Sequence, residues 1–125
     1  MVDALIWSRE MSVGNSDIDF QHRKIIDAAN MVRHLDGVDD IDILIAAADD
    51  LSDYTLKHFA FEEAALQGCG FAGFDDHKAQ HDAIRECVDT ITRNKTLVTT
   101  RMLDDVMSSI VHHILNDDRE YAGQI

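Results

Sequence analysis

The sequence contains no proline, only two cysteines and far fewer basic than acidic residues. Cys69 and Cys87 are too few for a disulfide framework, and their spacing does not suggest a zinc ribbon. We therefore expect two reduced thiols. Cys69 is expected to be the more exposed, because it lies between Gly68 and Gly70 in a predicted loop.

The shortage of basic residues excludes several functions. Lys and Arg total 11 against 24 Asp and Glu, so the formal net charge is -13, which argues against binding to nucleic acid or to an anionic membrane surface. No apolar run approaches the ~18 residues that a transmembrane helix needs. Residues 1–5 have neither the basic region nor the cleavage pattern of a signal peptide. We expect a cytoplasmic protein, and no protein partner is indicated.

In the absence of proline, glycines mark the predicted helix ends and loops. They lie at positions 14, 37, 68, 70, 73 and 123. Between them, apolar residues recur at spacings of three and four, which predicts helices and no strand. The predicted helices span about 16–35, 40–66, 75–94 and 99–116, after an irregular N-terminal arm over 1–15. Asp36-Gly37 closes the first helix. Short connections favour an all-α, up-down-up-down four-helix bundle, a single stand-alone domain over 1–125.

The histidines are the most informative residues of the chain. Five of the seven fall in register with the apolar stripes of the predicted helices: His22, His58, His77, His81 and His113. Glu62 lies one turn after His58 on the same stripe, and Asp118 follows His113. Imidazoles and carboxylates are costly to bury without compensation. A pair of metal ions at the centre of the bundle would compensate all seven residues.

The donor set restricts the metal. Side chains four apart stack on one helix face, so His77 and His81 can bind one ion side by side, and His58 and Glu62 have the same spacing. Seven donors are too many for one zinc ion and too rich in nitrogen for calcium or magnesium. Borderline ions such as iron fit better. Two octahedral-type sites bridged by the two carboxylates would use every donor and leave one coordination place free.

Three polar residues have plainer interpretations. Asp118 lies five residues after His113, which is not an ideal helical spacing. A frayed or bent helix end would let it reach back toward the core, but spacing alone slightly favours a solvated acid near the C-terminus. His34 is rotated off the stripe of His22, and His112 faces away from its neighbour His113. We expect both of these histidines to be exposed and without a role.

Four motifs together resemble the hemerythrin family, in particular the bacterial hemerythrins. They cover nearly the whole chain from residue 6 onward, and all seven expected ligand positions occur in order. The motifs are Ile6-Trp7-Ser8 with Ser12-Val13-Gly14 and Ile18-Asp19-Phe20-Gln21-His22, then His58-Phe59-Ala60-Phe61-Glu62-Glu63, then His77-Lys78-Ala79-Gln80-His81, and last His113-Ile114 with Asp118.

The resemblance implies a non-haem di-iron centre with an oxo or hydroxo bridge. Glu62 and Asp118 would bridge the two irons. One iron would be bound by His77, His81 and His113, and the other, with the open place for dioxygen, by His22 and His58. Ile25 and Ile110 are predicted apolar walls of the oxygen pocket, an assignment compatible with ordinary core positions. The implied function is reversible dioxygen binding for storage, delivery or sensing.

An enzyme is the alternative: a di-iron redox enzyme or a scavenger of peroxide or nitric oxide, or else a redox-sensing module. Ser109 keeps it open, because the family often has Trp near this position and its loss is expected to admit water, small anions or nitric oxide. Di-iron oxidases typically use more carboxylates and Glu-x-x-His motifs. No Glu-x-x-His occurs here, so we expect an oxygen-binding protein rather than an enzyme.

Overall fold

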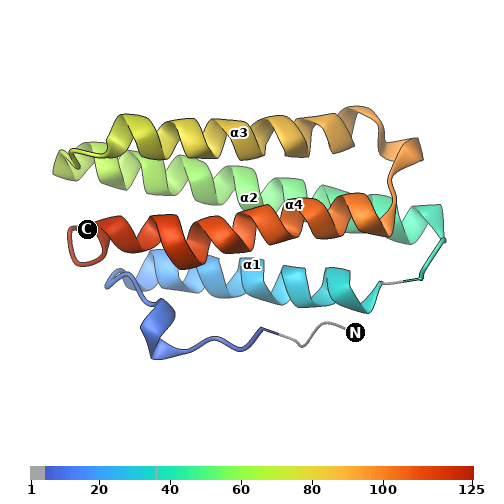
Figure 1. The fold of residues 1–125 in the computed structure, drawn as a ribbon, viewed down its shortest axis with the longest axis horizontal. Helices are drawn as coiled ribbons and strands as arrows, with labels where there is room; N and C mark the ends of the chain where they lie inside the picture. Colours follow the sequence, from blue (N-terminus) through green and yellow to red (C-terminus); the bar gives the residue numbers. More distant parts are fainter. Residues whose placement is uncertain (1–4, 36) are drawn as a thin grey trace.

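Four long helices lie side by side in the part of the chain that the structure describes (Figure 1). The computed structural model describes residues 5–35 and 37–125. The helices are α1 (Ser16–His34), α2 (Ile41–Cys69), α3 (Phe74–Arg93) and α4 (Thr100–His112). Successive helices run in opposite directions, and α1 and α3 each contact both α2 and α4. The described residues include no strand, so the predicted four-helix bundle is confirmed.

Short helices join and extend the long ones. Within the N-terminal arm lies η1 (Arg9–Met11), and η2 (Lys95–Leu97) connects α3 to α4. The chain continues beyond α4 through η3 (His113–Asp117), a turn of π-helix, into η4 (Asp118–Tyr121), a 3-10 helix. Residues 1–4 of the predicted arm, and Asp36 of the predicted stop Asp36-Gly37, lie outside the described residues.

Side-chain caps explain where the helices begin. Asn15 and Asp40 each accept two backbone N–H groups at the starts of α1 and α2, and Thr99 accepts one at the start of α4. Such caps satisfy amides that have no partner within the helix. Gly70, at a φ of 68°, ends α2 in the left-handed region that favours glycine.

The predicted end of α2 near residue 66 was wrong. The helix continues through Gly68 to Cys69, because one glycine within a last turn is tolerated and the left-handed stop comes only at Gly70. Cys69 therefore lies in a helix and not in a loop. Both Cys69 and Cys87 are free and exposed, so the expected difference in exposure between them is not found.

The described residues form two apolar clusters in the core. The larger one includes Ile25 of α1 and Phe59 of α2, and the smaller one includes Ile18 of α1 and Leu66 of α2. His22 falls between the two clusters along α1, and Glu62 falls between them along α2. A polar layer thus separates two apolar ones. None of the described helices is long and apolar enough to cross a membrane.

Candidate metal centre

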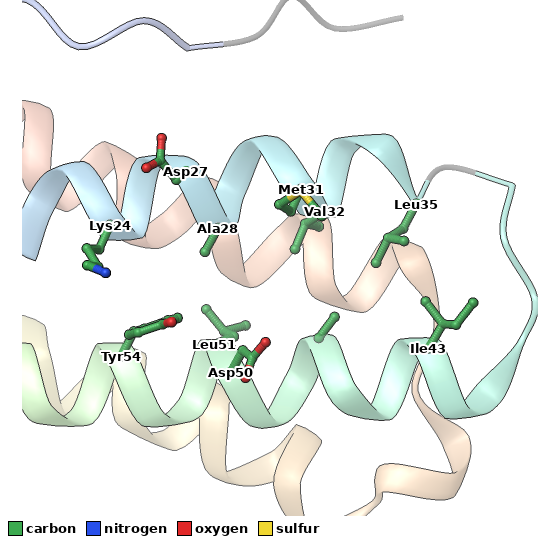
Figure 2. A pocket seen from close by; sticks show the side chains of 11 residues that line it. Lys24, Asp27, Ala28, Met31, Val32, Leu35, Ile43, Asp50, Leu51 and Tyr54 are labelled. Atoms are coloured by element: carbon green, nitrogen blue, oxygen red, sulfur yellow. The ribbon is translucent and has the colours of Figure 1, made fainter.

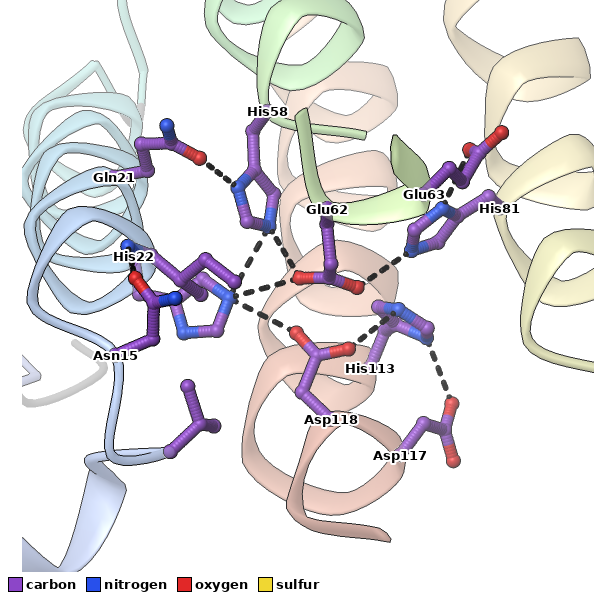
Figure 3. Close-up of polar contacts among 12 residues, drawn as sticks. Asn15, Gln21, His22, His58, Glu62, Glu63, His81, His113, Asp117 and Asp118 are labelled. Carbon is purple, nitrogen blue, oxygen red and sulfur yellow. Dashed lines mark hydrogen bonds and ion pairs between the residues drawn. The ribbon is translucent and has the colours of Figure 1, made fainter. Parts of the chain in front are cut away.

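Seven polar side chains meet in this layer, and Figure 3 shows most of them converging from all four sides of the bundle. Each is at most 2% exposed. The seven are His22 from α1, His58 and Glu62 from α2, His77 and His81 from α3, His113 from η3 and Asp118 from η4. The structure therefore brings together all seven residues that were predicted as metal ligands.

The π-helical turn brings Asp118 into this group. His113 opens η3 and Asp118 follows its last residue. In a π-helix the hydrogen bonds join residues five apart, so such residues share a face. Asp118 is 0% exposed and its Oδ1 lies 3.0 Å from Nε2 of His113. The solvated position that α-helical spacing slightly favoured is therefore wrong.

Glu62 divides its two carboxylate oxygens between two groups of histidines. Oε1 lies 2.6 Å from Nε2 of His77 and 3.1 Å from Nε2 of His81. Oε2 lies 3.0 Å from Nε2 of His58 and 3.5 Å from Nε2 of His22. One carboxylate thus faces imidazoles of α3 on one side and imidazoles of α1 and α2 on the other.

The two oxygens of Asp118 also face different groups of histidines. Oδ1 lies 3.0 Å from Nε2 of both His77 and His113, and Oδ2 lies 2.9 Å from Nε2 of His22. The resulting halves are His77, His81 and His113 on one side, and His22 and His58 on the other. Both carboxylates span the two halves, an arrangement suited to bridging two cations.

Three histidines are held from outside by residues that the sequence analysis did not select. In each case the outward Nδ1 donates to an oxygen. The pairs are His58 with Gln21 at 2.7 Å, His81 with Glu63 at 2.8 Å, and His113 with Asp117 at 2.9 Å. We assign the proton to Nδ1 because each of these oxygens can accept a hydrogen bond, and a neutral imidazole then directs the lone pair of Nε2 inward.

Two aromatic residues were also missed. The hydroxyl of Tyr121 donates to Oε2 of Glu62 at 2.8 Å, and Tyr121 is fully buried. Burial, followed by the charges of Asp118 and Glu62, raises the pKa of Tyr121 far above its usual value, so it remains a donor. The ring of Phe59 stacks on the imidazole of His81 with centroids 3.8 Å apart. Both contacts fix the orientation of a candidate ligand.

The buried donor atoms fit metal ions better than they fit one another. Both oxygens of Asp118, and Nε2 of His81 and of His113, are buried without a hydrogen bond to any described residue, although they lie close to other atoms of the site. Buried polar atoms are rarely left unpaired in folded proteins. Nitrogen and carboxylate donors that converge without hydrogen-bond geometry are what a bound cation requires.

Close contacts between imidazoles and carboxylates shift the pKa values of the site. Burial by itself lowers the pKa of His22 and of His77, but close contacts with Asp118 and Glu62 outweigh burial and raise both values to about 9. Burial raises the pKa of Glu62 and Asp118, yet contacts with the histidines lower that of Glu62 far below its usual value and that of Asp118 to about 2. At neutral pH both carboxylates are therefore ionised beside imidazolium groups.

Other residues selected from the sequence lie outside this layer. Ile25 and Ile110 are buried in the larger apolar cluster, which confirms their core positions, while their role beside bound oxygen stays a prediction. Ser109 is exposed and donates to the backbone oxygen of Asp105 within α4. Its predicted effect on access to the site stays a prediction. His34 and His112 are exposed as expected.

Two surface hollows adjoin α1 and α2. The one in Figure 2 has a volume of about 380 Å³, and Met31 and Tyr54 are among its mostly apolar lining residues. The seven candidate ligands are absent from its described lining. A second hollow, of about 310 Å³, is lined by Gln21 and His58. The candidate metal centre is thus approached from the surface at the outer face of His58.

The fold and the site together define a metal-binding four-helix bundle rich in histidine. The model of the hemerythrin HHE cation binding domain matches residues 13–125. Bacteriohemerythrin of Clostridium acetobutylicum is 31% identical, covering 93% of this chain and 97% of its own length. Hemerythrin of Siphonosoma cumanense is 30% identical over 64% of this chain and 65% of its own.

Solved structures agree with the sequence comparison. The crystal structure of a wild-type hemerythrin superposes with a TM-score of 0.85 at 26% identity, over 96% of both chains. This chain belongs to the hemerythrin family. The prediction of a hemerythrin-type oxygen-binding protein is therefore confirmed at the level of the family, and the cluster of histidines and carboxylates could hold a pair of metal ions.

Proposed function

We propose that this protein binds dioxygen reversibly at a non-haem di-iron centre with an oxo or hydroxo bridge, for oxygen storage, delivery or sensing. The observation that carries the proposal is the way Glu62 and Asp118 each direct one oxygen to either half of the site. Two ferrous ions, when bound, would supply the two electrons that reversible dioxygen binding uses. Residues 1–125 would form one domain of this kind.

The residues of each half have distinct proposed roles. His77, His81 and His113 would hold one iron, and His22 and His58 the other. With one histidine fewer, the second half has room for an exogenous ligand. Dioxygen is its proposed occupant, and small anions or nitric oxide are further candidates.

The surroundings support ligand binding without net oxidation of a substrate. Ile25 and Ile110 are proposed as apolar walls that exclude water from bound dioxygen, and both are almost fully buried. The donor set has five imidazoles and only two carboxylates. Fewer anionic donors stabilise high-valent iron less, so the centre can return to the ferrous state.

An absorption spectrum with an iron count tests the proposal. The dithionite-reduced protein is measured before and after admitting air, and again after oxygen is removed. We expect two irons per chain and an oxygen-dependent charge-transfer band that fades on deoxygenation. Two irons with immediate and irreversible oxidation would overturn reversible binding and favour a redox enzyme or scavenger.

Matched variants on α1 connect the spectrum to the site. His22→Ala removes a buried candidate ligand, whereas His34→Ala removes an exposed histidine from the same helix. We expect His22→Ala to lose iron and the oxygen-dependent band, and His34→Ala to retain both. Equal iron content in the two variants would contradict the ligand assignment.

A further inference from the structure

The outer contacts of the histidines differ between the two halves of the site. In the three-histidine half, the outer acceptors are the carboxylates of Glu63 and Asp117. In the two-histidine half, the outer acceptor of His58 is the neutral amide of Gln21. Nδ1 of His22 is buried and has no hydrogen-bond partner among the described residues. The two halves therefore differ in the chemistry of their outer acceptors as well as in the number of histidines: carboxylates in one half, of which Glu63 also pairs with Arg85, and an amide in the other.

The charge of an outer acceptor changes the donor strength of an imidazole. A carboxylate draws the Nδ1 proton toward itself and increases the electron density at Nε2, which makes the imidazole a stronger metal ligand. An amide oxygen is neutral and forms a weaker hydrogen bond than a carboxylate does. His58 is consequently a weaker donor toward the centre than a carboxylate-backed histidine in the same position would be.

We propose that Gln21 is a positioning residue that fixes the inward direction of Nε2 of His58 while keeping the two-histidine half the weaker of two unequal metal positions. The inference rests on the proposed function, because it concerns the same pair of ions. The two-histidine half is also the one with the proposed open place. A weaker donor set there leaves the metal more receptive to an added ligand.

The surroundings of Gln21 make the inference testable by a small change. Gln21 is only half-buried and lines the hollow of about 310 Å³, where Lys24 and Lys57 are also lining residues. A glutamate has nearly the same shape as glutamine and would meet positive charge there. Gln21→Glu should therefore fold and give His58 the carboxylate acceptor that His113 already has in Asp117.

The experiment is a cobalt(II) titration of the metal-free protein, with chelator competition to obtain both dissociation constants. For the wild type we expect two ions per chain with unequal affinities. Gln21→Glu should tighten the weaker position by about 10- to 100-fold, the range over which outer hydrogen bonds change metal affinity, and leave the stronger one unchanged. Asp117→Asn should instead weaken binding at the stronger position, which would bring the two dissociation constants closer together.

Two controls separate this role from a general effect of charge or packing. Lys24→Gln changes the net charge by the same single unit in the same hollow, and Lys24 has no described contact with His58. We expect it to alter neither constant by more than about twofold. Gln21→Ala should weaken the second position. In nitrogen-15 spectra, the Nδ1 proton of His58 should move downfield in Gln21→Glu, since a carboxylate makes the stronger hydrogen bond.

The outcomes are distinguishable. If the wild type does not bind two cobalt ions, the proposed function fails together with the inference. If it binds two, but Gln21→Glu leaves the weaker constant within about twofold or weakens it as Gln21→Ala does, the inference alone is overturned. A shift in Lys24→Gln equal to that in Gln21→Glu would also overturn it, because charge without contact would then suffice.

Discussion

Tyr121→Phe should destabilise the protein by removing a single hydrogen bond. The hydroxyl donates to Oε2 of Glu62 at 2.8 Å, and both residues are 0% exposed. A hydrogen bond to a charged group contributes about 1.5–3 kcal/mol. His58 also lies 3.0 Å from the same oxygen, so Glu62 is not left alone and we expect the lower part of this range, about 1.5–2 kcal/mol.

That free energy converts to a measurable shift in melting temperature. At about 2.1 cal/mol/K per residue, the unfolding entropy of 125 residues is roughly 0.26 kcal/mol/K, so the melting temperature should fall by about 6–8 °C. The phenyl ring keeps the packing of Tyr121 against Val13, Ile18 and Leu66. The loss therefore reports the hydroxyl alone.

Thermal unfolding followed by circular dichroism measures this shift, in the metal-free and the metal-loaded protein. Tyr54→Phe is the matched control, because Tyr54 is 40% exposed on α2 and surface changes are usually within about 0.5 kcal/mol. A difference in melting temperature of less than about 2 °C between Tyr121→Phe and Tyr54→Phe corresponds to about 0.5 kcal/mol or less. Such a result in both forms would show that the hydrogen bond from Tyr121 to Glu62 does not stabilise the fold.

Four further predictions concern the site and its surroundings. His77→Ala removes one buried partner from both Glu62 and Asp118, which keep contacts with other histidines. It should lose iron and about 3 kcal/mol of stability, the lower end of the range for breaking a buried pair. An unchanged iron content and melting temperature would refute its assignment as a ligand. In the metal-free protein, protonated His22 and His77 stabilise the folded state, because folding raises the pKa of each to about 9. This stabilisation is complete below pH 6.5 and is lost as the pH rises through about 9, so the urea concentration at the unfolding midpoint should fall between those pH values. Metal loading near pH 7.5 should release about two protons, since both imidazoles are protonated until a metal displaces the proton; a flat midpoint and no proton release in a weakly buffered titration would contradict these values. Ser109→Trp would place a ring on the exposed surface of α4 at this position and should slow autoxidation, if the missing ring admits water as predicted. An unchanged stopped-flow decay of the oxygenated protein would show that this position does not control access.

The four long helices could be predicted from the sequence because their apolar residues repeat at the helical period over many turns. The ends were less accessible. The structure places the end of α2 at Cys69, since the conformation of Gly70, and not the mere presence of glycine at residue 68, terminates the helix. A period identifies a helix, whereas its last residue depends on one backbone angle.

Six of the seven candidate ligands follow from the same periodicity, and Asp118 does not. At an α-helical spacing, residues five apart point in different directions, so an argument from pattern alone places Asp118 in solvent. The chain instead widens into a π-turn at His113–Asp117, a local departure that has no signature in the apolar repeat. The spacing left open a bend or fray at the helix end that would bring Asp118 back toward the core, and the resemblance to a family with a ligand at this position favoured that alternative.

The outer acceptors show a further limit of pattern arguments. Asp117 lies four residues after His113, so its contact lies within one turn and could have been read from the spacing. Gln21 adjoins His22 on α1 but accepts from His58 on α2, and Glu63 adjoins Glu62 on α2 but accepts from His81 on α3. Each of these contacts joins two neighbouring helices, and it forms only when the two helices are aligned lengthwise in one particular register. The residues that orient the candidate ligands thus also fix the alignment of the helices that carry them, and no single-helix pattern contains that information.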